Sequence, residues 1–226
     1  MNKYIFKRFN FSNKYKKELI EFLKNISNAE IGGNRLYDGS GNHYMQNAKE
    51  IAELVFYLKK HQLKKKIKFS NFLEIGYAAG INNSILNKFF TFKKIVSVDI
   101  IDPSGTNTNT FFANLRFKNL TLVFGDSTDQ KNIETVKKLG FYDLIFIDGG
   151  HDYETAKKDF QNYSKFLSRN GLIILHDIKS NLVKGVPKLW NEIKSKEKKN
   201  WLFKEIFDSG QMMECGLGIL SKKNDS

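Results

Sequence analysis

Cysteine and proline are almost missing from this chain of 226 residues. The single cysteine, Cys215, excludes an intramolecular disulfide and suits the reducing cytoplasm. Two prolines and no long Gly/Ser tract argue against internal linkers, and no internal repeat is found. We therefore expect one compact domain, with a helical cap region over residues 1–68 and a core over residues 69–226.

Long apolar runs and a signal peptide are lacking as well. No stretch approaches the roughly 18 residues that a membrane-spanning helix needs. The opening residues, MNKYIFKRFNF, do not contain the apolar segment of a secretory signal. We expect a cytoplasmic protein without a membrane span.

Arginine is scarce although the chain is basic. The formal net charge is +13, yet four of the 37 basic residues are arginine and the lysines are scattered. Nucleic-acid-binding proteins favour arginine, because its guanidinium contacts bases and phosphates through two hydrogen bonds. The charge therefore favours solvated lysine faces over a polyanion-binding surface, and we expect no nucleic-acid partner.

Two amphipathic helices are predicted in the first third of the chain. Apolar residues recur at helical spacing around Leu19 and Leu23, and again from Ile51 to Leu58. Residues 31–46, which lie between them, are rich in Gly and Asn and predict an irregular loop. His43 in this loop is either an ordinary exposed residue or part of a lid over a ligand.

Short apolar strands alternate with helices from residue 72 onward. The expected strands are residues 72–75, 94–100, 120–124, 142–147 and 172–175, and the helix before the last of them is expected to carry Phe160, Tyr163 and Leu167 on one face. Two further runs, 201–207 and 215–223, lie too close together for a helical crossover, so an antiparallel pair is expected. This pattern predicts an α/β fold with a Rossmann-like, doubly wound sheet of seven strands, mostly parallel with an antiparallel C-terminal pair.

Polar residues follow successive strands at one edge of this sheet. In such folds ligands bind beyond the carboxyl ends of the strands. Ordinary loop polarity would explain one or two of these residues, but not a carboxylate or histidine after four successive strands. The residues are Gly76, Asp99, Asp126, Asp148, His151, His176 and Asp177.

The segment EIGYAAG, residues 74–80, leaves the first strand and enters a helix for which Asn82 or Asn83 is available as the N-cap. Its small residues would let a ligand approach the N–H groups at the helix N-terminus. The dinucleotide fingerprint G-x-G-x-x-G fails at Ile81, which disfavours NAD. The loop therefore suits a smaller and less anionic ligand.

Asp99 and Asp126 extend this pattern towards a nucleoside. Asp99 can accept hydrogen bonds from both ribose hydroxyls, and Asp126 is placed to receive an adenine amino group. With LEIGYAAG, SVDI, GDST, FIDGGHDYE and GLIILHDI in this order, the chain resembles the class I S-adenosylmethionine-dependent methyltransferases. IDGGHDYE with LHDI looks most like the small-molecule O-methyltransferases that tailor sugars, macrolides and related metabolites.

The resemblance implies S-adenosylmethionine as the cofactor and a small hydroxylated molecule as the acceptor. Ala78 stands where the family often has Gly, which is expected to shift the loop rather than block it. The resemblance also allows a homodimer through the N-terminal helices. The residues it assigns to the cofactor are Gly76, Tyr77, Ala78 and Gly80 for the methionine part, Asp99 for the ribose, and Asp126 and Ser127 for the adenine.

His151 and Asp148 are the predicted catalytic pair. A sugar hydroxyl is a poor acid, so methyl transfer to it needs a base or a metal. Histidine accepts a proton near neutral pH, and Asp148 would support His151 while Asp177 holds the acceptor or a metal. In metal-dependent relatives Mg²⁺ is held by an aspartate at the position of Asp148 and by an acidic pair, or Asp-Asn, at the positions of His176 and Asp177. His176 is not the oxygen ligand that Mg²⁺ prefers, so a histidine base and a divalent metal such as Mg²⁺ or Mn²⁺ both stay open, and His176 would orient the acceptor or ligate a softer metal.

Three further expectations concern neighbouring residues and competing functions. Asp152 is expected to cap the helix that begins at Tyr153. Cys215, beside Met212 and Met213, is expected to pack or line a pocket rather than act as a nucleophile. The competing functions are an RNA or DNA methyltransferase, which the charge supports but whose N/D-P-P-aromatic motif is missing, and a non-catalytic adenosyl-binding protein.

Overall fold

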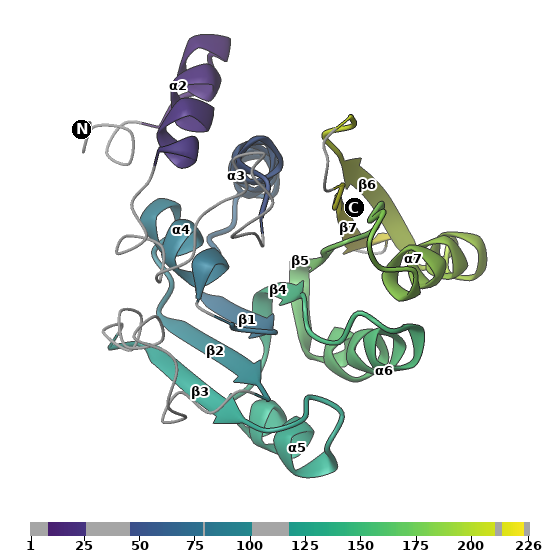
Figure 1. Ribbon diagram of the computed structural model, residues 1–226. Coiled ribbons are helices and arrows are strands. Elements are labelled where there is room, and N and C mark those ends of the chain that lie inside the picture. Colours follow the sequence, from purple (N-terminus) through teal and green to yellow (C-terminus); the bar gives the residue numbers. More distant parts are fainter. Residues whose placement is uncertain (1–8, 26–45, 79, 101–117, 211–213, 224–226) are drawn as a thin grey trace.

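A seven-stranded sheet with the order β3-β2-β1-β4-β5-β7-β6 forms the centre of the molecule (Figure 1). The structure is a computed structural model and describes residues 9–25, 46–78, 80–100, 118–210 and 214–223. The strands are β1 (Asn71–Ile75), β2 (Lys94–Asp99), β3 (Leu120–Phe124), β4 (Tyr142–Ile147), β5 (Leu167–Leu175), β6 (Trp201–Ile206) and β7 (Leu217–Lys222). Strands β1 to β5 pair in parallel, and β7 runs antiparallel to both β5 and β6. The predicted fold class is confirmed.

Helices cover both faces of the sheet. Apolar strand residues point alternately to the two faces, so Phe72 and Phe146 pack with one helical layer while Leu73 and Ile145 pack with the other. Burial on both faces explains why the strands are almost continuously apolar. One layer contains α2 (Asn13–Lys24), α3 (Ala48–Lys65) and α4 (Ile81–Phe89); the other contains α5 (Gln130–Lys138), α6 (Tyr153–Tyr163) and α7 (Gly185–Lys196).

The boundary between α6 and β5 differs from the prediction. Helix α6 ends at Tyr163, a 3₁₀ turn follows (η3, Ser164–Phe166), and β5 begins at Leu167. Leu167 therefore does not lie on the helix face, as predicted, but pairs with Tyr142 of β4. A single leucine fits a helical and a strand pattern equally well, so periodicity could not separate the two. Strand β2 likewise ends at Asp99, one residue earlier than predicted.

The N-terminal helices and the sheet share one apolar cluster. Leu19 and Leu23 of α2 and Leu54 of α3 are fully buried in the cluster that also contains Phe72. The division between a cap region and a core at residue 68 stays a prediction. His43, Met212 and Met213 lie outside the described residues.

The position of the site follows from the strand order. Strands β2 and β3 lie on one side of β1, and β4 and β5 lie on the other. Where the order reverses in this way, the loops at the carboxyl ends of the neighbouring strands separate and leave a crevice for a ligand. Among the helices that the structure describes, none is both long enough and apolar enough to cross a membrane.

Candidate functional site

The loop after β1 has an unusual backbone. Gly76, Ala78 and Gly80 have φ angles of 87°, 44° and 73°, a region that residues other than glycine rarely adopt. A Cβ atom on Gly76 would lie 2.0 Å from the carbonyl oxygen of Asp148, so the loop is pressed against the segment that follows β4. Ala78 nevertheless adopts the left-handed conformation, and its N–H donates a hydrogen bond of 2.6 Å to Asp99 Oδ2.

A buried carboxylate supports this loop from below. Glu74 is fully buried, and burial raises its pKa well above the usual value. Asn83 donates its side-chain N–H to Glu74 Oε2 and to Ser97 Oγ. The prediction that Asn82 or Asn83 caps α4 is therefore wrong: Gly80 is the N-cap residue, without a side-chain cap bond. A buried carboxylate needs a hydrogen-bond partner more than an exposed helix end does.

A cavity of about 430 Å³ opens between this loop and the loops after β2, β3 and β4. Six of the seven residues predicted to bind the cofactor line it. The seventh, Gly80, is the N-cap residue directly before α4 and does not line the cavity. The six lining residues are Gly76, Tyr77, Ala78, Asp99, Asp126 and Ser127.

The loop after β3 is held in place from α6. Asp126 Oδ1 accepts hydrogen bonds from the N–H and the hydroxyl of Thr128, and these bonds lower the pKa of Asp126. Ser127 donates its hydroxyl to Asp159 Oδ1 at 2.7 Å. Asp159 is fully buried, and burial raises its pKa to about 7. The sequence reasoning missed Asp159, although a carboxylate on the apolar face formed by Ala156, Phe160 and Tyr163 is a signal that could have identified it.

His151 stands at the rim of the cavity between two carboxylates. Its Nε2 lies 3.5 Å from Asp148 Oδ1 and 3.5 Å from Asp177 Oδ2. The imidazole is 45% exposed, whereas the two carboxylates are 13% and 9% exposed. The hydrogen bond to Asp148 raises the pKa of His151 above its usual value. The predicted catalytic residues are thus brought together.

His176 lies deeper, beneath the same carboxylates. Its Nδ1 is 3.0 Å from Asp148 Oδ1 and 3.5 Å from Asp177 Oδ2. Burial would lower the pKa of His176, but the charges of Asp148 and Asp177 and the hydrogen bonds to them raise it well above the usual value. Asp177 has a φ angle of 62°, so the backbone turns sharply where β5 ends.

Two groups of side chains offer ligand atoms that all lie within 4.8 Å of one another in the described part of the chain. The first consists of Asp148, His151 and Asp177; the second consists of His176, Asp177 and Cys215. The first group combines two carboxylates with His151, which lines the cavity and is 45% exposed, and so is more accessible to a divalent cation than the predicted set with His176, which is 5% exposed. Cys215 is buried, and burial raises the pKa of its thiol, which agrees with packing rather than nucleophilic chemistry.

Asp152 and Gln46 complete the surroundings of the site. Asp152 caps α6 as predicted, with its carboxylate accepting the N–H of Thr155 at 3.0 Å. Gln46 was not predicted, because the sequence placed it at the end of a loop. Its side-chain N–H donates to Asp148 Oδ2 at 2.9 Å, and it lines the cavity.

Comparison with known proteins finds a methyltransferase domain in the part of the chain that surrounds the cavity. Residues 73–178 match the family model described as "Methyltransferase domain", a range that contains β1 to β5 and the loops around the cavity. The sheet order and this match together define a methyltransferase fold. Residues 73–178 thus match a methyltransferase domain, and the sheet has the Rossmann-like fold of the class I S-adenosylmethionine-dependent methyltransferases.

Solved structures of this class share the fold at low sequence identity. An O-methyltransferase from Bacillus cereus in complex with S-adenosylhomocysteine (SAH) is 14% identical, with 97% of this chain and 96% of that chain covered and a TM-score of 0.58. An rRNA methylase from Streptococcus thermophilus is 11% identical, with 73% and 94% covered and a TM-score of 0.54. The fold by itself therefore does not select the acceptor.

Two further relatives match this chain over only about half of their own length. The mycinamycin-pathway methyltransferase MycE, solved with Mg, SAH and mycinamycin VI, is 16% identical, with 74% of this chain and 48% of that chain covered and a TM-score of 0.51. An uncharacterized protein of Acanthamoeba polyphaga mimivirus is 26% identical over 111 residues, 47% of this chain and 50% of the relative. The chain thus spans about half the length of each.

Proposed function

We propose that the protein transfers a methyl group from S-adenosylmethionine to a hydroxyl group of a small acceptor, a sugar or natural-product intermediate. The observation that carries the proposal is that His151 and Asp148 line the same cavity as the glycine loop, with Asp177 Oδ2 3.5 Å from His151 Nε2. A base beside a cofactor cavity suits an acceptor that must lose a proton. A protein that only bound the cofactor would not need such a base.

The cofactor would lie across the carboxyl ends of β1, β2 and β3. The loop of Gly76 and Ala78 would hold its methionine part, Asp99 its ribose, and Asp126 with Ser127 its adenine. Asp99 now accepts a hydrogen bond from the N–H of Ala78, so its carboxylate is already oriented at the cavity wall. This pre-orientation would lower the cost of ordering on binding.

The reaction is an in-line displacement at the methyl carbon. The acceptor oxygen forms a bond to the methyl group as the bond between carbon and sulfur breaks, and the sulfur keeps the electron pair. Because His151 Nε2 faces two carboxylates, it carries the ring hydrogen, and the lone pair on Nδ1 takes the hydroxyl proton. Alignment of acceptor and sulfonium supplies much of the remaining rate.

A divalent cation would fit the group formed by Asp148, His151 and Asp177, and when bound it would lower the pKa of the acceptor hydroxyl. Two carboxylate oxygens are ligands that Mg²⁺ and Mn²⁺ accept. The MycE complex contains Mg, and activation of the acceptor by a cation is the alternative to the histidine base. The mycinamycin VI bound in that complex supports a small-molecule acceptor, and the scattered lysines disfavour a nucleic acid.

Titration calorimetry tests the cofactor part of the proposal. SAH should bind and NAD should not, because Ala78 and Ile81 stand where a dinucleotide site has its second and third glycines. Asp99→Ala should weaken SAH binding by about 1–3 kcal/mol, since a charge-assisted hydrogen bond to the ribose is lost. Tight NAD binding, or no binding of SAH, would contradict the proposal.

A further inference from the structure

Gln46 reaches the predicted catalytic carboxylate from a distant part of the chain. It lies directly before Asn47, the N-cap residue of α3, and 102 residues before Asp148. Its side chain is 1% exposed, and its Nε2 donates a hydrogen bond of 2.9 Å to Asp148 Oδ2. An apolar side chain in place of this buried amide would remove the donor to Asp148 Oδ2, and a buried carboxylate oxygen requires a donor.

The two oxygens of Asp148 have different partners. Oδ1 faces the histidines, at 3.0 Å from His176 Nδ1 and 3.5 Å from His151 Nε2. Oδ2 is engaged by Gln46. The carboxylate is thus held on both sides, and the direction in which Oδ1 points towards His151 depends on the donor at Oδ2.

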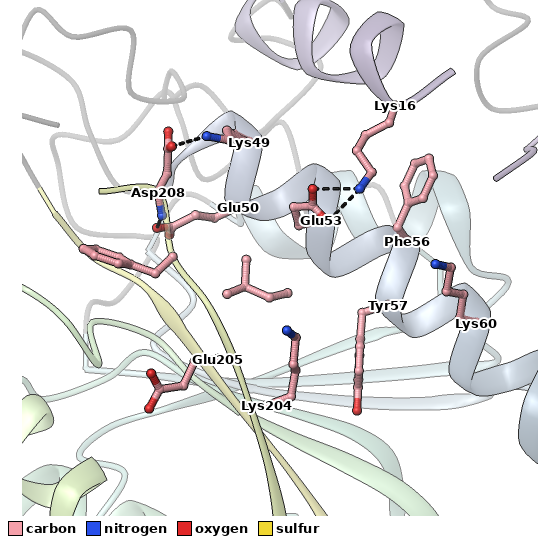
Figure 2. A pocket seen from close by; sticks show the side chains of 12 residues that line it. Lys16, Lys49, Glu50, Glu53, Phe56, Tyr57, Lys60, Lys204, Glu205 and Asp208 are labelled. Atoms are coloured by element: carbon pink, nitrogen blue, oxygen red, sulfur yellow. Dashed lines mark hydrogen bonds and ion pairs between the residues drawn. The ribbon is translucent and has the colours of Figure 1, made fainter. Parts of the chain in front are cut away.

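The start of α3 is attached to residues between the two C-terminal strands, one after the end of β6 and one before the start of β7. Glu50, which is 2% exposed, accepts the N–H of Asp208 at 2.9 Å and the N–H of Gly216 at 3.1 Å. Lys49 forms an ion pair with Asp208. Figure 2 shows Lys49 and Glu50 on the first turn of α3, with Asp208 beside them. These contacts fix the backbone from which Gln46 extends.

We propose that Gln46 is a positioning residue, which holds the carboxylate of Asp148 so that its other oxygen orients His151 for proton transfer. The inference rests on the proposed methyl transfer, because it assigns Gln46 a part in the same site. Gln46 acts through Asp148 and does not exchange a proton itself.

The test compares Gln46→Met with wild type. Methionine keeps the length of the side chain but removes the donor, so kcat should fall roughly 10–100-fold while the KM for S-adenosylmethionine and the affinity for SAH stay within about twofold. In Gln46→Asn the side chain is one methylene shorter, so its amide cannot reach Asp148 Oδ2 and the same loss of kcat is expected. This variant replaces Gln46→Met in the test if Gln46→Met folds poorly. Gln62→Met, the same substitution further along α3, is the matched control and should keep full activity.

A double-mutant cycle separates positioning from a general structural role. In an Asp148→Ala background, Gln46→Met should cause no further loss of kcat, because the residue through which it acts is gone. The same cycle measured by chemical unfolding should be non-additive, whether or not an acceptor is known. Additive effects in both cycles, or a fully active Gln46→Met, would overturn the inference. A wild-type protein that methylates no hydroxyl acceptor would instead contradict the proposed function.

Discussion

His151 stands between two carboxylates that are more buried than itself, and this arrangement decides its proton affinity. A histidine near negative charge keeps its proton to higher pH. The raised pKa of His151 follows from its hydrogen bond to Asp148 and is opposed by partial burial. The same contact that orients the base therefore also makes it a stronger one.

The pH dependence of kcat/KM follows from this contact. Only the neutral imidazole accepts a proton, so activity should rise with pH as His151 loses its proton, with the midpoint above the usual value of about 6.5. Asp148→Asn removes the charge and should move the midpoint to lower pH while it lowers the maximal rate. A pH–rate profile in which the midpoint does not move would contradict this role of Asp148.

Asp159 predicts a pH dependence of stability. Its pKa is about 7 in the folded protein because of burial, and about 3.9 in an unfolded chain. The folded state therefore binds more protons between these values, and stability falls as pH rises from about 4 to 7. Asp159→Asn removes the buried charge but keeps an acceptor for Ser127, so it should stabilise the protein at pH 8 and have little effect at pH 4. Unfolding curves with equal shifts at both pH values would refute this explanation.

The loop between β1 and α4 depends on close backbone contact rather than on side chains. A Cβ atom on Gly76 would overlap the backbone of Asp148, and the φ angle of 87° is strained for any other residue. The loops after β1 and β4, which meet at the cavity, can approach each other only because this residue is glycine.

Gly76→Ala should therefore destabilise the protein by about 2–4 kcal/mol and weaken SAH binding, since both steric overlap and backbone strain are introduced. Gly210→Ala is the matched control, because Gly210 has a similar φ angle of 82° and open space around it. It should cost only about 1 kcal/mol. Thermal unfolding and calorimetry measure both effects, and equal losses in the two variants would contradict the steric explanation.

The strands were predictable because burial on both sheet faces leaves a nearly continuous apolar run, as in residues 142–147 of β4. The end of α6 was not predictable, because Leu167 fits both a helix and a strand pattern. Its pairing with Tyr142 of β4 places it in the strand. The cap of α4 was predicted wrongly for a similar reason. The buried Glu74 engages Asn83 through a tertiary contact that local sequence does not reveal.

The site was predictable only in part, because some of its contacts are tertiary side-chain contacts that local sequence does not reveal. Residues at strand ends are brought together by the fold itself, so Asp99, Asp148 and Asp177 could be named from strand positions. Gln46 and Asp159 reach the site from helix-bearing segments through side-chain hydrogen bonds. Contacts of that kind depend on how layers pack, which periodicity does not describe.

Part of the basic charge is neutralised locally by ion pairs with carboxylates. Lys16 pairs with Glu53 at 2.7 Å and Lys157 with Glu192 at 3.3 Å, and both Lys179 and Lys194 pair with Glu205. Lys16 and Glu53 line the groove between α3 and β6 that Figure 2 shows. In the same groove Asp208 donates its N–H to Glu50 and pairs through its carboxylate with Lys49. Such pairs reduce the potential that a polyanion would meet.

We therefore expect weak, non-specific binding to nucleic acid. Non-specific dissociation constants lie in the range of about 10⁻⁴–10⁻⁶ M at physiological salt. A gel-shift titration with RNA and DNA at about 150 mM salt measures this directly. Submicromolar affinity would show that the lysines form a recognition surface and would favour a nucleic-acid acceptor.

The measurement that tests the central claim most directly is transfer of a labelled methyl group from S-adenosylmethionine to small hydroxylated acceptors, by wild type and by His151→Ala. If His151 is the base, the variant should bind SAH normally but transfer roughly 10²–10⁴-fold more slowly, and a chelator should leave the wild-type rate unchanged. If a cation activates the acceptor instead, the chelator should abolish transfer, Mg²⁺ or Mn²⁺ should restore it, and Asp148→Ala and Asp177→Ala should both be defective. Full activity of His151→Ala and Asp148→Ala with chelator present would contradict the site assigned to this protein.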